Sequence, residues 1–131
     1  IDKFVSKNPQ KAIAFASLGQ VRYLSALQYV DAVVGNTSSG ITEAPSFKIG
    51  TINIGNRQKG RTQAKSVINA KANSVSLDNA FKKLYSPEFQ QSLQDIVNPY
   101  YQRNSSKKTK EVLKNIDLHN IIKKEFRDII C

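Results

Sequence analysis

The sequence has little of what builds disulfides, metal centres or membrane spans. Its 131 residues include one cysteine, Cys131, and one histidine, His119. A single cysteine cannot close an internal disulfide, which fits a reducing compartment such as the cytoplasm. One cysteine and one histidine are too few for a zinc site, and no apolar run approaches the roughly 20 residues that cross a bilayer. We therefore expect a cytoplasmic protein with no bound metal or cofactor and no membrane span.

Acidic residues are also scarce, and the imbalance lies in the second half of the chain. Ten Asp and Glu stand against twenty Lys and Arg, which gives a formal net charge of +10. Residues 1–56 contribute five cations and three anions, whereas residues 57–131 contribute fifteen and seven. Such a surplus suits nucleic acid, an acidic surface or an anionic small ligand. Lysines on a solvated face are the plainer explanation, and charge alone selects none of these partners.

The hydrophobic residues, 40% of the chain, fall into short segments whose patterns alternate between strand and helix. β-Branched apolar runs predict strands at residues 32–34, 51–54 and 66–69. Helical spacing predicts helices at residues 21–29, 39–47, 77–85, 88–97, 111–116 and 117–130. Residues 11–18 fit either a buried strand or the start of a helix, and residues 1–9 fit either the end of a helix or a loop. The alternation predicts an α/β fold with a mostly parallel sheet.

The length suits one domain, which we place over residues 1–131. Within it, residues 105–131 form a basic connector and terminal amphipathic helices, because polar and lysine-rich residues 104–110 precede the helical patterns. An apolar face that is left exposed on the last helix would favour association with another surface. We therefore expect self-association, as a homo-oligomer, through the apolar residues Ile121, Ile122, Phe126 and Ile129.

Two loops leave the carboxyl ends of predicted strands, where parallel sheets bind ligands. The first, residues 35–40, reads Gly-Asn-Thr-Ser-Ser-Gly and leads into a short helix. Glycines let the backbone approach a ligand, and hydroxyls with free N–H groups at a helix start favour a phosphate. The second, residues 55–61, adds the cations Arg57, Lys59 and Arg61. Together the loops predict an anion site at one edge of the sheet.

Taken singly, these residues also have plainer explanations. Ser38 and Ser39 belong to a residue type that caps helices everywhere, and Glu43 suits the first turn of a helix. Arg57 alone fits a surface charge, as do its cationic neighbours. It is the combination within one short stretch that favours a ligand site.

Residues 35–61, GNTSSGITEAPSFKIGTINIGNRQKGR, closely resemble the nucleotide-binding segment of the UDP-N-acetylglucosamine 2-epimerases, and the hydrolysing branch is the better match. The similarity runs from about residue 17 to about residue 68. It continues more weakly over residues 98–113, where Asn-Pro-Tyr-Tyr stands in place of the family's Asn-Pro-Tyr-Gly. The first loop, the glutamate that follows it and the Arg-Gln loop form a specific combination.

The resemblance implies a fold and a set of binding residues. It implies the C-terminal half of a glycosyltransferase-B-type enzyme, in which Rossmann-like halves face each other and the C-terminal half holds UDP. Thr37 and Ser38, with the backbone of Ser39 and Gly40, then hold the diphosphate. Glu43 accepts hydrogen bonds from the ribose hydroxyls, and Arg57 is a cation at the UDP site. These roles agree with the donors and acceptors that phosphate and a ribose diol require.

The resemblance also implies an activity, the conversion of UDP-N-acetylglucosamine to N-acetylmannosamine and UDP for sialic acid or capsular sugar biosynthesis. The family's catalytic carboxylates lie in its N-terminal half, so we expect no catalytic residue in this chain and no activity without that half as partner. A sister enzyme for another UDP-sugar, such as a diacetamido-trideoxy sugar, or a glycosyltransferase of similar fold is the first alternative. A basic nucleic-acid-binding module is the remote one, because no nucleic-acid motif is present.

Overall fold

The computed structural model describes residues 1–119 and divides the chain into two compact units. The first unit is Ile1–Tyr101, and the second begins at Gln102. Within residues 1–119, no helix combines the length and the apolar character needed to span a bilayer. The assignment of one domain to residues 1–131 stays a prediction.

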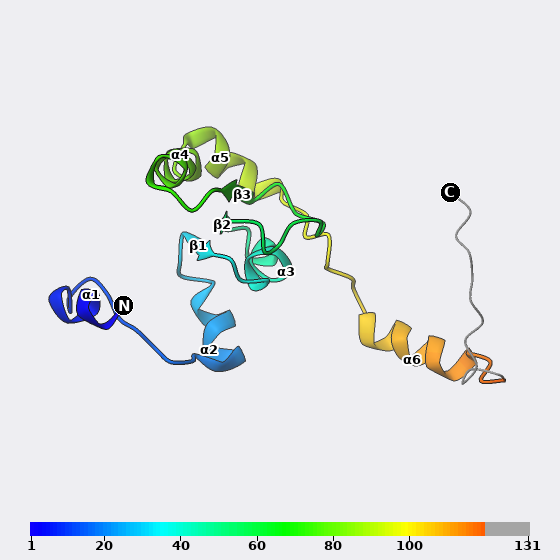
Figure 1. Cartoon of the computed structure of the whole chain (residues 1–131). Helices are drawn as coiled ribbons and strands as arrows, with labels where there is room; N and C mark the ends of the chain where they lie inside the picture. Colours follow the sequence, from blue (N-terminus) through cyan, green and yellow to red (C-terminus); the bar gives the residue numbers. More distant parts are fainter. Residues whose placement is uncertain (120–131) are drawn as a thin grey trace. The chain divides into compact units, whose positions relative to one another are not determined.

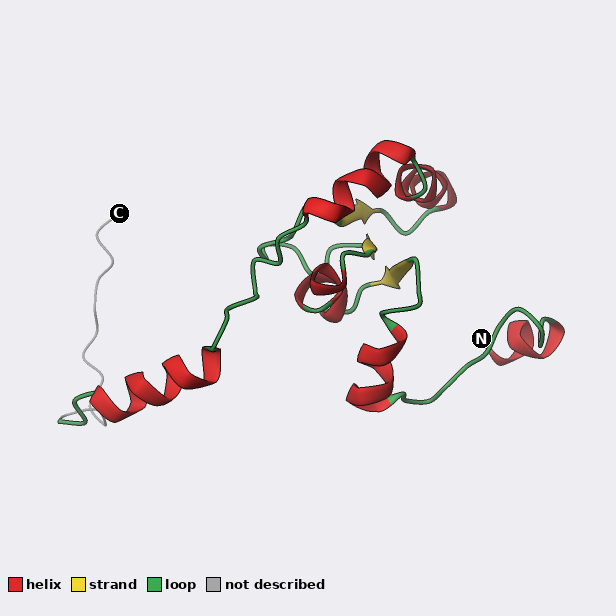
Figure 2. Ribbon diagram, turned by 180° about the vertical axis from the view of Figure 1, so that it is seen from behind, coloured by secondary structure: helices red, strands yellow, loops and turns green. Residues whose placement is uncertain are grey.

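A three-stranded parallel sheet organises the first unit (Figures 1 and 2). Its strands are β1 (Ala32–Gly35), β2 (Gly50–Ile54) and β3 (Val67–Ala70), in the order β1-β2-β3. Val34 of β1 lies opposite Ile52 of β2, which lies opposite Ile68 of β3. All three predicted strands form within one residue of their expected bounds, and the α/β prediction is confirmed.

Helices connect and follow the strands. They are α1 (Asp2–Lys7), α2 (Gly19–Ala26), α3 (Ser39–Thr42), α4 (Ser74–Leu84), α5 (Pro87–Ser92) and α6 (Ser105–Asn115), with the 3₁₀ turns η1 (Ala44–Phe47) and η2 (Leu93–Asp95). Helix α5 begins one residue before the predicted range 88–97, because Pro87 suits the first helical position and the Ser86 hydroxyl accepts a hydrogen bond from the Phe89 N–H at 3.3 Å. Residues 11–18 are neither strand nor helix.

Some predicted boundaries were wrong for identifiable reasons. The expected helix 39–47 splits into α3 and η1, because Pro45 has no N–H to continue an α-helix. Helix α4 begins earlier than predicted because the Asn73 side chain caps it by accepting the Ser76 N–H. Helix α6 includes most of the segment expected to be a connector. The predicted helix 117–130 is absent at residues 117–119, and its remainder, with the proposed self-association residues, lies outside the described residues.

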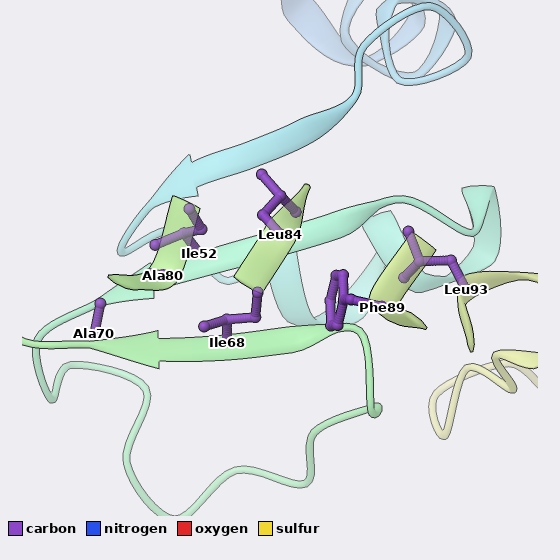
Figure 3. Packing of buried hydrophobic residues seen from close by; sticks show 7 residues of the cluster. All are labelled: Ile52, Ile68, Ala70, Ala80, Leu84, Phe89 and Leu93. Atoms are coloured by element: carbon purple, nitrogen blue, oxygen red, sulfur yellow. The ribbon is translucent and has the colours of Figure 1, made fainter. Parts of the chain in front are cut away.

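Helices α4 and α5 cover one face of the sheet and enclose the main hydrophobic core (Figure 3). The core residues are Ile52, Ile68, Ala70, Ala80, Leu84, Phe89 and Leu93. Leu84 is completely buried, and a Cβ added to Gly50 would lie 2.3 Å from its Cδ1. Fully burying a leucine or phenylalanine side chain contributes about 1.5–3 kcal/mol, so this face supplies much of the unit's stability.

Helix α3 contacts the other face of β2, because side chains alternate along a strand and Thr51 faces away from the Ile52 core. The Thr51 hydroxyl donates a 2.7 Å hydrogen bond to the Gly40 carbonyl. Ile41 and Ala44 are fully buried on this side. Apolar side chains are thus buried on both sides of β2, and the α3 side adds a polar link between Thr51 and the helix backbone.

Candidate nucleotide site

The two loops singled out in the sequence lie next to each other at the carboxyl ends of β1 and β2. A glycine with positive φ stands where each strand gives way to its loop: Gly35, the last residue of β1, has a φ of +147°, and Gly55, directly after β2, has a φ of +77°. Other residues are strained in this conformation. Arg57 Nη1 donates to the Asn36 carbonyl at 3.1 Å, and Gln58 Nε2 donates to the same carbonyl at 2.8 Å. The second loop therefore holds the backbone of the first.

Gln58 is a residue of this site that sequence reasoning missed. It is only 3% exposed, although it lies in a loop between two exposed cations. Within the described part of the chain its Oε1 has no hydrogen-bond partner, so only the amide nitrogen is used. A buried amide oxygen without a partner is costly. The contact with the first loop joins residues 22 positions apart, which no local pattern reveals.

Hydroxyl groups cluster at the start of α3. Thr37 Oγ1 lies 3.2 Å from Ser39 Oγ and accepts a 3.4 Å hydrogen bond from the Ser39 N–H. The Tyr23 hydroxyl, from α2, lies 2.6 Å from the same Ser39 Oγ. Sequence reasoning did not select Tyr23, which was assigned only to a helix. The cluster offers several hydroxyl donors and acceptors side by side.

Ser38 and Gly40 have different roles from their neighbours. Ser38 is the N-cap residue of α3, but its side chain makes no capping hydrogen bond. Its carbonyl accepts the Ile41 and Thr42 N–H groups at 2.9 Å. Gly40 is buried, and a Cβ there would lie 2.6 Å from Thr51 Cγ2. Glycine is thus required at position 40 so that α3 can approach β2, and its backbone contact with a diphosphate stays a prediction.

An open depression of about 630 Å³ lies beside these hydroxyls. Thr37, Ser39 and Glu43 line it, together with residues from the loop before α2 and from α2 itself, namely Phe15, Ser17, Leu18, Gly19, Gln20 and Tyr23. Three predicted site residues therefore border one hollow. Ser38, Gly40 and Arg57 do not line it, and Arg57 joins the site through the Asn36 carbonyl. Both the volume and the mixture of aromatic and polar lining suit a small organic ligand.

A parallel sheet with helices on both faces and two polar loops at its carboxyl edge defines an α/β fold, a class whose members commonly bind ligands at that edge. The sequence model of the UDP-N-acetylglucosamine 2-epimerases matches residues 1–114. The chain belongs to this family. The resemblance seen in residues 35–61 is thereby confirmed.

Three curated relatives are similar to the chain. It is 44% identical over 130 residues to a GDP/UDP-N,N'-diacetylbacillosamine 2-epimerase (hydrolyzing) from Campylobacter jejuni, an alignment that covers 98% of the chain and 33% of the relative. It is 35% identical over 108 residues to a polysialic acid biosynthesis protein from Escherichia coli, covering 82% and 28%. It is 29% identical over 131 residues to a UDP-N-acetylglucosamine 2-epimerase from Neisseria meningitidis, covering 98% and 34%. The chain spans about a third of the length of these relatives.

Proposed function

We propose that this chain is the UDP-binding, C-terminal portion of a hydrolysing UDP-N-acetylglucosamine 2-epimerase. The intact enzyme would convert UDP-N-acetylglucosamine to N-acetylmannosamine and UDP for sialic acid or capsular sugar biosynthesis. The observation that carries the proposal is the contact between the two loops of residues 35–61, the stretch of the family resemblance, at the carboxyl edge of the sheet. Ligands of α/β proteins bind at this edge.

We propose one orientation for the nucleotide at this edge. The diphosphate would lie against the hydroxyls of Thr37 and Ser38 and the backbone of Ser39 and Gly40, because phosphate oxygens need donors. Glu43 would accept hydrogen bonds from the ribose hydroxyls, since a carboxylate is a strong acceptor. Arg57 would add positive charge near the diphosphate. The nucleoside would then extend into the adjoining depression, which Glu43 borders.

The chemistry assigned to this chain is the stabilisation of a leaving group. In the intact enzyme, UDP would be eliminated from the sugar, and water would then add with inversion at the second carbon. Donors and a cation fixed at the diphosphate lower the cost of the negative charge that develops on it. Proton abstraction and delivery would fall to carboxylates of an N-terminal domain, so this chain alone would be inactive. The partner domain, the homo-oligomer and the cytoplasmic location stay predictions.

The proposal is tested by calorimetric titration of UDP into the chain and into matched pairs of variants. Glu43→Ala and Arg57→Ala should each weaken UDP binding by about tenfold or more, because charge-assisted hydrogen bonds contribute about 1.5–3 kcal/mol. Glu88→Ala and Lys82→Ala remove charges of the same two signs from exposed positions on α5 and α4, outside both loops, and should bind as the unaltered chain does. Equal losses in both pairs, or no binding by a chain whose circular dichroism shows it folded, would contradict the proposal.

The names of the relatives suggest a second substrate. The relative at 44% identity is named for N,N'-diacetylbacillosamine, whereas the one named for UDP-N-acetylglucosamine is 29% identical. A portion that holds the nucleotide does not read the sugar, so identity here leaves the sugar open. Product analysis of the intact enzyme with both UDP-sugars decides between them. A parallel titration with GDP shows whether the site prefers uracil or guanine, since the name of the Campylobacter relative includes both nucleotides.

The nucleic-acid alternative has a direct control. The surplus of twenty cations over ten anions motivates it. Titration with random RNA at low and high salt should show only weak binding. Tight binding with a steep salt dependence would instead support phosphate-backbone recognition and displace the proposal.

A further inference from the structure

Asn98 is a buried side chain that reaches the segment carrying Glu43 from a distant part of the sequence. It is 7% exposed and follows the 3₁₀ turn η2. Its Nδ2 donates to the Thr42 carbonyl at 2.9 Å and to Ser46 Oγ at 2.6 Å. Thr42 ends α3 directly before Glu43, and Ser46 lies in η1 directly after it. One amide group therefore ties together both sides of the turn that carries Glu43.

The rest of the Asn98 side chain holds its own turn. Its Oδ1 accepts the Tyr100 N–H at 2.9 Å, and its carbonyl accepts the Tyr101 N–H at 3.0 Å. Tyr101, which stands where the family pattern has glycine, does not have a positive φ, so this turn needs no glycine. Because the nitrogen faces two acceptors and the oxygen faces a donor, the amide is fixed in one orientation.

The same segment also reaches the second loop of the site. The Tyr100 hydroxyl donates to the Thr62 carbonyl at 2.9 Å, shortly after the loop that contains Arg57. A further link is the hydrogen bond from the Lys48 ammonium, at the end of η1, to the Gln94 carbonyl. Residues 94–100 therefore brace the segment around Glu43 and connect it to the polypeptide that follows Arg57.

We propose that Asn98 is a positioning residue, which fixes the backbone on both sides of Glu43 so that the carboxylate meets the ribose of the nucleotide. This inference rests on the function proposed above. Asn98 does not line the depression that Glu43 borders, so it acts through Thr42 and Ser46 rather than on the ligand. Its loss leaves the Thr42 carbonyl and the Ser46 hydroxyl without this partner and frees the turn between them.

The first arm of the test measures amide hydrogen exchange by NMR and needs no nucleotide. The Glu43 N–H donates to the Ser39 carbonyl, and the Ser46 N–H donates to the Glu43 carbonyl. In Asn98→Ala both amides should exchange about tenfold faster, because the variant loses the equivalent of roughly one hydrogen bond that holds this turn. The Thr51 amide in β2 serves as reference, because general destabilisation speeds all sites alike. Unchanged ratios between these amides would overturn the proposal. Asn79→Ala, an exposed asparagine on α4, is the control and should change none of them.

The second arm measures affinity for UDP and for 2′,3′-dideoxy-UDP, which lacks the ribose hydroxyls. Asn98→Ala should weaken the binding of UDP by about tenfold, which corresponds to the loss of roughly one charge-assisted hydrogen bond. The binding of the dideoxy analogue should weaken much less, because that ligand has no ribose hydroxyls for Glu43 to accept from. Equal losses for both ligands would mean a purely structural role and overturn the proposal. Ser46→Ala removes a single exposed partner and should give a smaller shift in the same direction, which keeps the test decisive if Asn98→Ala does not fold.

The two arms separate this inference from the function on which it rests. If the unaltered chain binds no UDP, the proposed function fails, and the exchange arm alone decides whether Asn98 fixes the turn. If UDP binds and depends on Glu43 but the exchange ratios do not change in Asn98→Ala, the function stands and the positioning role is wrong.

Discussion

The two faces of β2 divide the work of the first unit. On one face, Ile52 packs with Leu84 and Phe89 in an apolar core. On the other, Thr51 contacts the α3 backbone through a hydrogen bond, and α3 leads directly to Glu43. The first face contributes to stability mainly through buried apolar surface. The second face fixes the position of α3 through the Thr51 hydrogen bond and the close approach at Gly40. Substitutions on the two faces should therefore separate folding from nucleotide binding.

The largest effect on stability is expected on the apolar face. Leu84→Ala removes a completely buried side chain and should lower the free energy of unfolding by about 2–5 kcal/mol. UDP affinity, measured well below the unfolding midpoint, should stay unchanged. Urea denaturation measures the first quantity. The control Leu113→Ala, at a 67% exposed leucine of α6, should change stability by less than about 0.5 kcal/mol.

Two buried glycines on opposite faces provide a matched pair. A Cβ at Gly50 meets Leu84 Cδ1 at 2.3 Å, and a Cβ at Gly40 meets Thr51 Cγ2 at 2.6 Å. Overpacking of this kind costs about 1–3 kcal/mol, so Gly50→Ala and Gly40→Ala should destabilise the chain comparably. Only Gly40→Ala should also weaken UDP binding, because it pushes α3 away from β2. Equal UDP affinity in the two variants would remove the distinction between the faces.

The smallest effect on stability is expected at Gln58. Gln58→Met loses the donor to the Asn36 carbonyl but also removes a buried oxygen that has no partner among the described residues. These effects offset each other, so the free energy of unfolding should change by less than about 1 kcal/mol. UDP affinity should nevertheless fall several-fold, because the first loop is held less firmly. A large loss of stability with unchanged affinity would show that Gln58 serves the fold alone.

The strands and the loops that follow them were predicted well from the sequence. The strands were placed within one residue because β-branched runs are local signals, and the loops that follow them carry a family motif. The boundaries of α3 and α6 were harder. Pro45 divides the first, and the lysine-rich stretch before residue 111, interpreted as a connector, is compatible with helix.

The residues that hold the site were not predicted because their partners are distant in sequence. Gln58 contacts Asn36 across 22 positions, and Asn98 contacts Thr42 across 56. Tyr23 contacts Ser39 across 16. Gln58 and Asn98 both lie within the quoted family motifs, but the motifs do not show that these amides are buried against distant backbone carbonyls. Motifs thus mark the segments of a proposed site, whereas tertiary structure shows which atoms in them are in contact.

The most direct test of the account is an NMR titration of the ¹⁵N-labelled chain with UDP. We expect the amide signals of residues 37–40, Glu43 and Arg57 to shift with one common affinity, while the signals of the lysine-bearing helix α6 do not change. Shifts confined to α6, or none in the loops at saturating UDP, would contradict a nucleotide site at the carboxyl edge of the sheet.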